Sequence, residues 1–146
     1  MNTSVSGKCL CGAVTFKATR PPNSVRTCWC RDCQYWAAGS ATVNAVFDIE
    51  AISIDGEMAY HESRADSGSH MKRGFCPKCG TPMTSGADER PHLMIVRLGV
   101  LDEAEKYGPQ MTIWTSSAPK WAQIDPDLPQ YEKGMPAAPE ADTADK

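Results

Sequence analysis

Seven cysteines carry most of the chemistry that this sequence offers, and they fall in three short clusters. Two clusters are pairs and one is a trio: Cys9 and Cys11, Cys76 and Cys79, and Cys28, Cys30 and Cys33. Two pairs supply the four thiolates of a closed tetrahedral zinc site, which is typical of structural zinc. A trio supplies three ligands and leaves the fourth position for water or a substrate, as in catalytic zinc sites. These clusters predict one structural and one reactive metal site.

Disulfides and redox pairs are the alternatives to metal binding. A disulfide framework is disfavoured because the number of cysteines is odd, no export signal is evident, and Cys-x-Cys neighbours bridge poorly. Residues 30–33 and 76–79 each have the Cys-x-x-Cys spacing of a redox pair, but we find no βαβ pattern near them. Metal binding accounts for all seven cysteines at once, and thiolate ligands favour zinc.

The two pairs are expected to share one metal ion. Each is followed directly by a glycine, Gly12 and Gly80, as in a knuckle-like turn that directs backbone amides toward thiolate sulfur. Because the pairs are far apart in the sequence, a shared metal would staple distant segments and contribute its binding free energy to folding.

The trio lies where a strand end is expected to lead into a short helix. Cys33 would sit near the start of that helix, where backbone N–H groups and the helix dipole lower a thiol pKa. A distant histidine, His61, His70 or His92, could instead close the site as a fourth ligand. A further alternative is a trio that stays reduced and metal-free and serves only in packing.

Aromatic and basic residues surround the trio in the sequence. The aromatic ones are Trp29, Tyr35 and Trp36, and the basic ones are Arg26, Arg31, Lys72 and Arg73. Core filling is one role for the aromatic residues, and the other is that Trp29 and Trp36 wall a substrate pocket. Guanidinium groups bind carboxylates through paired hydrogen bonds. We therefore predict that Arg26, Arg31 and Arg73 contact the carboxylates of a small anionic thiol.

Length and charge limit the class of protein. A chain of 146 residues predicts one domain, expected over residues 1–132, while the acidic, Pro/Ala-rich residues 133–146 predict a disordered tail. No apolar run or signal peptide is evident, so we predict a cytoplasmic protein without a membrane partner. The net charge of −3, more negative with thiolate–zinc sites, argues against nucleic acid as a partner. Oligomeric state is left open.

Short alternating segments predict a mainly β fold. The expected strands cover residues 13–17, 42–47, 49–54, 60–62, 71–75, 83–85 and 93–98, the last apolar enough for a central strand. The dipeptide Asp55-Gly56 is typical of a hairpin turn. Only residues 31–38 have a helix-like composition, and Gly39 is expected to end that helix.

Three segments together resemble the glutathione-dependent formaldehyde-activating family, which includes the centromere protein V-type domain. They are residues 7–16 (GKCLCGAVTF), 28–33 (CWCRDC) and 73–81 (RGFCPKCGT), and weaker similarity extends the match over residues 5–132. The resemblance implies a β-rich zinc fold of the Mss-four-like type. It also implies a structural zinc on Cys9, Cys11, Cys76 and Cys79 and a catalytic zinc on Cys28, Cys30 and Cys33.

The same resemblance implies a reaction. Members of the family join glutathione and formaldehyde into S-hydroxymethylglutathione, a carbon–sulfur lyase reaction run in reverse. One departure from the family pattern is Thr112, because a histidine often precedes the isoleucine that corresponds to Ile113. Two other functions are open: a non-catalytic, zinc-stabilised protein-binding module on the same fold, and a sensor whose trio forms a reversible disulfide.

Overall fold

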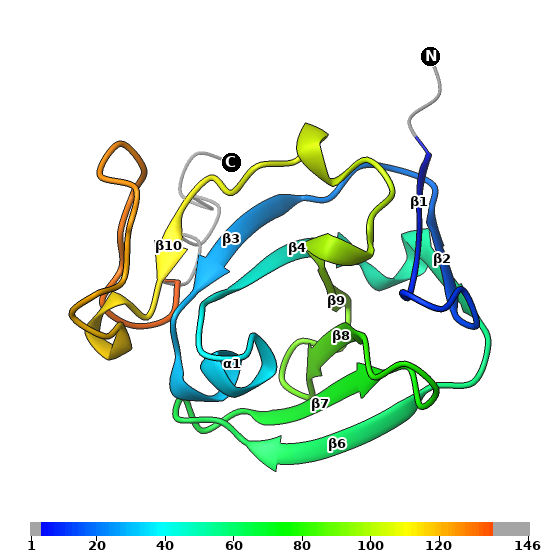
Figure 1. The fold of residues 1–146 in the computed structure, drawn as a ribbon, viewed down its shortest axis with the longest axis horizontal. Helices are drawn as coiled ribbons and strands as arrows, with labels where there is room; N and C mark the ends of the chain where they lie inside the picture. Colours follow the sequence, from blue (N-terminus) through cyan, green and yellow to red (C-terminus); the bar gives the residue numbers. More distant parts are fainter. Residues whose placement is uncertain (1–3, 136–146) are drawn as a thin grey trace, which may run out of the picture.

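The computed structural model describes residues 4–135 as two sheets with one short α-helix (Figure 1). The smaller sheet has the order β1-β2-β5, with β1 (Val5–Lys8), β2 (Thr15–Ala18) and β5 (Ile52–Asp55). The larger has the order β10-β3-β4-β9-β8-β7-β6, with β3 (Ser24–Cys28), β4 (Thr42–Asp48), β6 (Ala59–Arg64), β7 (His70–Phe75), β8 (Pro82–Ala87), β9 (Leu93–Arg97) and β10 (Thr112–Ile113). All pairings are antiparallel except β10 with β3.

Helices are few in the described residues, which confirms the mainly β prediction. The α-helix, α1 (Arg31–Trp36), follows β3, and 3-10 turns are η1 (Ile49–Ala51), η2 (Leu98–Val100), η3 (Ala104–Lys106) and η4 (Thr115–Ser117). None of the helices within residues 4–135 has the length and apolar character needed to span a membrane. Residues 136–146 of the predicted tail lie outside the described part of the chain.

Most of the expected strands are present. Those predicted at residues 13–17, 42–47, 60–62, 71–75, 83–85 and 93–98 correspond to β2, β4, β6, β7, β8 and β9. β9 is the fourth of seven strands, as expected for the most apolar segment. The strand predicted at residues 49–54 is half correct, because its first half forms η1 and only the second half pairs as β5. The helix ends at Trp36, two residues short of the prediction.

Asp55-Gly56 does not close a hairpin, contrary to the prediction. β5 pairs with β2 in the small sheet, whereas β6 pairs with β7 in the large one, so the dipeptide lies where the chain crosses between sheets. Gly56 has a φ of 112°, and a Cβ there would lie 2.3 Å from the Ala13 carbonyl oxygen. Glycine therefore permits a close approach of two chain segments, which a local turn signal does not distinguish from a hairpin.

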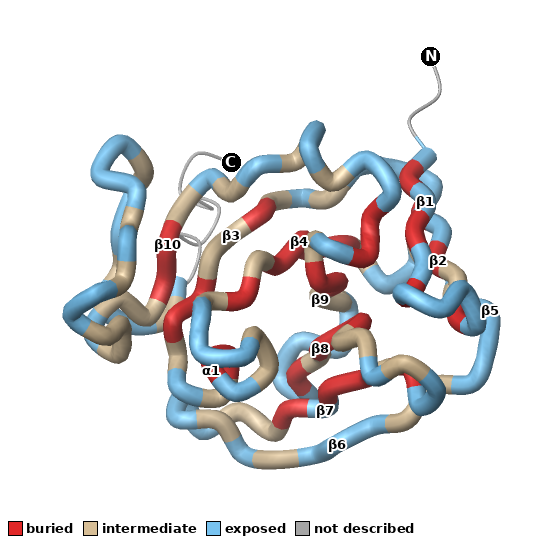
Figure 2. Tube along the Cα trace, in the orientation of Figure 1, coloured by how far each residue is buried: buried red, intermediate tan, exposed pale blue. Residues whose placement is uncertain are grey.

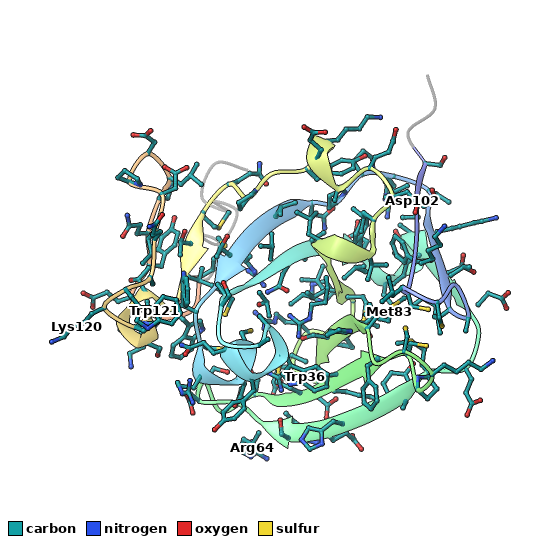
Figure 3. The ribbon with its side chains drawn as sticks, viewed as in Figure 1. Trp36, Arg64, Met83, Asp102, Lys120 and Trp121 are labelled. Atoms are coloured by element: carbon teal, nitrogen blue, oxygen red, sulfur yellow. The ribbon has the colours of Figure 1, made fainter. Side chains whose placement is uncertain are left out.

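The main core contains side chains from both sheets. The rings of Phe16 on β2 and Phe47 on β4 meet edge to face, with centroids 5.3 Å apart. Met83 on β8 is also fully buried (Figure 3), and Figure 2 marks the buried segments of both sheets. Cys9 and Cys76 belong to this core. A second, smaller cluster contains Cys28, Cys33 and Ile113. Each group of cysteines is thus anchored in its own hydrophobic cluster.

We expect Gly56→Ala to destabilise the fold strongly. The matched control is Gly39→Ala, because Gly39 also has a positive φ, 103°, but no atom lies within 4 Å of its added Cβ. Backbone strain alone should cost the control about 1 kcal/mol, and the clash at Gly56 should bring its loss to about 3 kcal/mol. Chemical unfolding of the metal-loaded proteins measures both values. Equal losses of unfolding free energy in the two variants would show that the close approach at Gly56 adds nothing to the cost of the substitution.

Candidate metal and substrate site

The two cysteine pairs converge into one cluster that joins the sheets. The Sγ atoms of Cys9, Cys11, Cys76 and Cys79 all lie within 4.8 Å of one another. Cys11 is 3.6 Å from Cys9 and 3.8 Å from Cys76 between sulfur atoms. One pair follows β1 and precedes β2, and the other lies between β7 and β8. A metal at this quartet would tie the small sheet to the large one.

The two loops of the quartet close in the same way. The N–H of Cys9 donates to the Val14 carbonyl and the N–H of Cys76 to the Thr81 carbonyl, both at 3.0 Å. The glycine after each pair is left-handed, with φ of 81° and 78°, as expected for knuckle-like turns. The Val14 N–H also donates to Cys9 Sγ at 3.3 Å. Hydrogen bonds from Thr81 lower the pKa of Cys79 to about 5, which favours the thiolate form that binds metal.

The trio gathers at the junction of β3 and α1. Cys28 ends β3, Cys30 is the N-cap of α1, and Cys33 lies in its first turn. The three Sγ atoms lie within 4.8 Å of one another, and Cys30 Sγ accepts a hydrogen bond from the Cys33 N–H at 3.4 Å. Strand end and helix start thus present three sulfurs to one point, and the two sites account for all seven cysteines.

No histidine completes the trio. Among residues 4–135, no His, Asp or Glu side chain joins the three sulfurs in a larger ligand cluster. His70 Nδ1 instead lies 2.7 Å from an Asp88 carboxylate oxygen, and His61 and His92 are exposed. Within the described chain, the trio therefore offers three ligands and leaves a fourth position to a ligand from outside.

Arg97 is a buried cation beside the trio that the sequence analysis did not identify. Its Nη1 donates to Asn44 Oδ1 at 2.6 Å, and Asn44 Nδ2 donates to Thr42 Oγ1 at 3.0 Å. Asn44 and Arg97 are directly paired between β4 and β9. The sequence signals for this contact were an arginine at the end of an apolar strand and two polar residues on one face of β4. Neither signal indicated which residue the arginine would bind.

The electrostatics of the trio fit a bound cation. Hydrogen bonds from the other two thiols, with a smaller effect from the Arg97 charge, lower the pKa of Cys33 to about 2. Hydrogen bonds with Cys30 and Cys33 raise the pKa of Cys28, so the three thiols do not ionise together without a metal. The buried Nε and Nη2 atoms of Arg97 have no partner within the described chain. Three thiolates around Zn²⁺ would carry one net negative charge, and the unpaired N–H groups of Arg97 can stabilise that charge.

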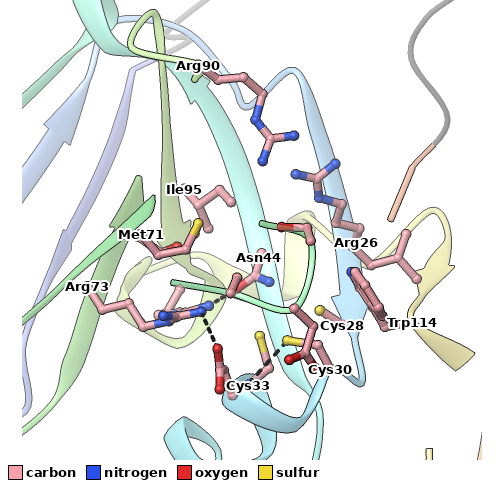
Figure 4. Close-up of a pocket in the computed structure, with 17 residues that line it drawn as sticks. Arg26, Cys28, Cys30, Cys33, Asn44, Met71, Arg73, Arg90, Ile95 and Trp114 are labelled. Carbon is pink, nitrogen blue, oxygen red and sulfur yellow. Dashed lines mark hydrogen bonds and ion pairs between the residues drawn. The ribbon is translucent and has the colours of Figure 1, made fainter. Parts of the chain in front are cut away.

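A pocket opens over the trio (Figure 4). Besides the three cysteines, its charged lining is Arg26, Arg73, Arg90, Arg97, Asp32 and Asp66, and its apolar lining includes Met71, Ile95, Ile113 and Trp114. Two of the predicted contacts, Arg26 and Arg73, are among these residues. Arg90 and Trp114 were not predicted, because each comes from a segment distant from the trio in the sequence.

Three other predicted contacts lie outside the pocket lining. Trp29 and Trp36 pack against other aromatic rings, with centroid distances of 6.1 Å and 5.9 Å. Arg31 is exposed and lies over the Tyr35 ring, 4.9 Å from its centroid. Lys72 lies over a tyrosine ring on β6 in the same manner. Proximity to the trio in sequence therefore did not predict proximity to the pocket.

Thr112, which the sequence comparison marked as a departure from the resembled family, also lies outside the pocket lining. Thr112 is buried on β10, and its neighbour Ile113 lines the pocket. Successive side chains of a strand face opposite sides. The Thr112 side chain is therefore on the face of β10 away from the trio.

Comparisons with known proteins found a family match and a structure of similar fold. A family described as "Glutathione-dependent formaldehyde-activating enzyme" matches residues 4–117, more than half of the chain. A crystal structure of a Rhodobacter sphaeroides protein, a structural genomics target, has a similar fold, with a TM-score of 0.56 and 16% identity over 86% of this chain and 98% of that one. No curated protein matches the chain. From the match over residues 4–117, this chain is a member of the glutathione-dependent formaldehyde-activating enzyme family.

Proposed function

We propose that this protein is a zinc-dependent carbon–sulfur lyase that joins a small thiol and a small aldehyde, with glutathione and formaldehyde as the pair suggested by its family. The trio is the observation that carries the proposal. Its three sulfurs lie within 4.8 Å of one another, at a pocket, with no fourth protein ligand in the described chain. The quartet, whose ligands are all supplied by protein, would hold a structural zinc.

The residues around the trio have distinct roles in this proposal. Cys28, Cys30 and Cys33 would hold the zinc, which when bound stabilises a substrate thiol as its thiolate near neutral pH. Arg97 places a buried positive charge beside Cys33 and so offsets the negative charge of the ligand set. Ile113 at the pocket wall provides an apolar surface for the substrate.

The proposed reaction involves no net oxidation or reduction and needs no further reactant. The substrate sulfur adds to the aldehyde carbon, so that a carbon–sulfur bond forms as the carbon–oxygen π bond breaks. The oxygen then takes up the proton that the thiol loses. Cleavage of the adduct follows the same path in reverse.

We also propose a cytoplasmic location, since a reducing compartment keeps the seven thiols available to metal.

We expect two zinc ions per chain, with separable effects on stability. Cys76→Ser should remove the quartet metal and lower the unfolding temperature by roughly 10 °C or more, because binding of a structural metal contributes directly to folding free energy. Cys30→Ser should remove only the trio metal and leave a folded protein with one zinc. Native mass spectrometry and thermal unfolding measure these outcomes. Equal destabilisation by both substitutions would argue that the trio is a second structural site.

We expect glutathione to act on the trio metal alone. In the cobalt-substituted wild-type protein, glutathione should change the absorption spectrum of the metal, whereas the Cys30→Ala variant should show no such change. The variant should also fail to accelerate the formation of S-hydroxymethylglutathione, which NMR with ¹³C-formaldehyde follows. Lys17→Gln, on the exposed face of β2, is the control and should behave as wild type. A metal spectrum that glutathione leaves unchanged would contradict the enzyme proposal and favour a zinc-stabilised binding module.

A further inference from the structure

Two of the four arginines that line the pocket have partners within the chain. Arg73 is buried, donates to Ser63 Oγ at 3.1 Å, and lies 3.7 Å from an Asp32 carboxylate oxygen. Arg97 is bonded to Asn44 and lies beside the trio. Arg73 therefore has an acidic partner, and Arg97 is held in place beside the trio sulfurs by Asn44.

Arg26 and Arg90 form a guanidinium pair without a carboxylate partner among residues 4–135. Arg26 lies on β3 and Arg90 in the loop between β8 and β9, and Figure 4 shows their guanidinium groups turned toward one another. Neither side chain makes an ion pair or a hydrogen bond to another described residue, and Arg26 Nε is buried without a partner. Two cations held together in this way are stabilised by an anion between them.

The carboxylates of the pocket do not supply that anion. Asp32 is directed to Arg73, and Asp66, the other acidic residue in the lining, forms no ion pair with Arg26 or Arg90. The pair lies in the same pocket as the trio sulfurs, with the apolar side chains of Ile95 and Trp114 nearby (Figure 4). One small molecule can therefore meet both the trio and the arginine pair.

We infer that Arg26 and Arg90 bind a carboxylate of the thiol substrate while its sulfur lies at the trio. The inference rests on the proposed function and deepens it, because it makes the enzyme selective for anionic thiols. Guanidinium groups bind carboxylates through two parallel N–H···O bonds, so two facing arginines select both the charge and the shape of this group. A neutral thiol reaches the trio without this contribution to binding.

The experiment compares binding of four probes by isothermal titration calorimetry. The probes are glutathione, its glycine monoethyl ester, cysteinylglycine and S-methylglutathione; the second lacks the glycine carboxylate, the third the γ-glutamyl carboxylate and the fourth a free thiol. The variants are Arg90→Gln and Arg26→Gln, and Arg90 is exposed and lies in a loop. Lys17→Gln, on the other sheet, is the control that removes the same charge. We expect Arg90→Gln to weaken glutathione binding about tenfold, with no loss in the control.

The truncated probes decide whether the loss is due to a carboxylate. The ester or cysteinylglycine, whichever lacks the bound carboxylate, should bind wild type more weakly than glutathione does and be insensitive to Arg90→Gln. An equal loss for all probes, or none, would overturn the inference.

S-methylglutathione and the cobalt spectrum separate this inference from the proposed function. If S-methylglutathione binding depends on Arg90 while no thiol alters the metal spectrum, the carboxylate site stands and the proposed function fails. If glutathione alters the spectrum with equal affinity in wild type and Arg90→Gln, the proposed function stands and the carboxylate site fails.

Discussion

Repulsion between thiolate sulfurs is the constraint on which this fold depends, because sulfurs held within 4.8 Å of one another ionise together only around a cation. In the quartet, the sulfurs come from loops of two different sheets. Metal binding there would act on the same sheet contact as the packing of Phe16 against Phe47. A chain of 146 residues buries only a modest core, so a metal that joins its two sheets adds to a limited hydrophobic contribution.

The trio meets the same constraint with a different set of charges. Its ligands come from one strand end and one helix start, so it joins no distant segments through the metal itself. Buried Arg97 offsets its charge, and Asn44 holds that guanidinium in place through a 2.6 Å hydrogen bond. The quartet is therefore suited to stabilising the fold. The trio, with an incomplete ligand set and an arginine-lined pocket, is suited to binding a further anionic ligand.

Local patterns predicted most strands because alternation of apolar and polar residues reports directly on which face of a strand is buried. No strand range was predicted for β1, β3 or β10. The wrong predictions, at residues 49–56, occur where the chain leaves a sheet. Asp55-Gly56 has the residues of a hairpin, but its flanking strands join different sheets. The residues before Ile52 have strand-like composition but form a 3-10 turn. In both places, long-range pairing overrode a local preference.

By itself, the sequence determined the grouping of the cysteines, because ligand type and short spacing are properties of a few adjacent residues. It also indicated that the two pairs could share a metal, and the structure brings their sulfurs together. Only the tertiary structure decided which side chains surround the trio. Arg97 lies opposite Asn44 through the register of β4 and β9, and Arg90 is brought to face Arg26 by the loop between β8 and β9. Trp29 and Trp36 are close to the trio in the sequence but lie outside the pocket lining. The physical reason is that neighbours along a strand or helix point in different directions, so the lining of a pocket depends on contacts that no local pattern contains.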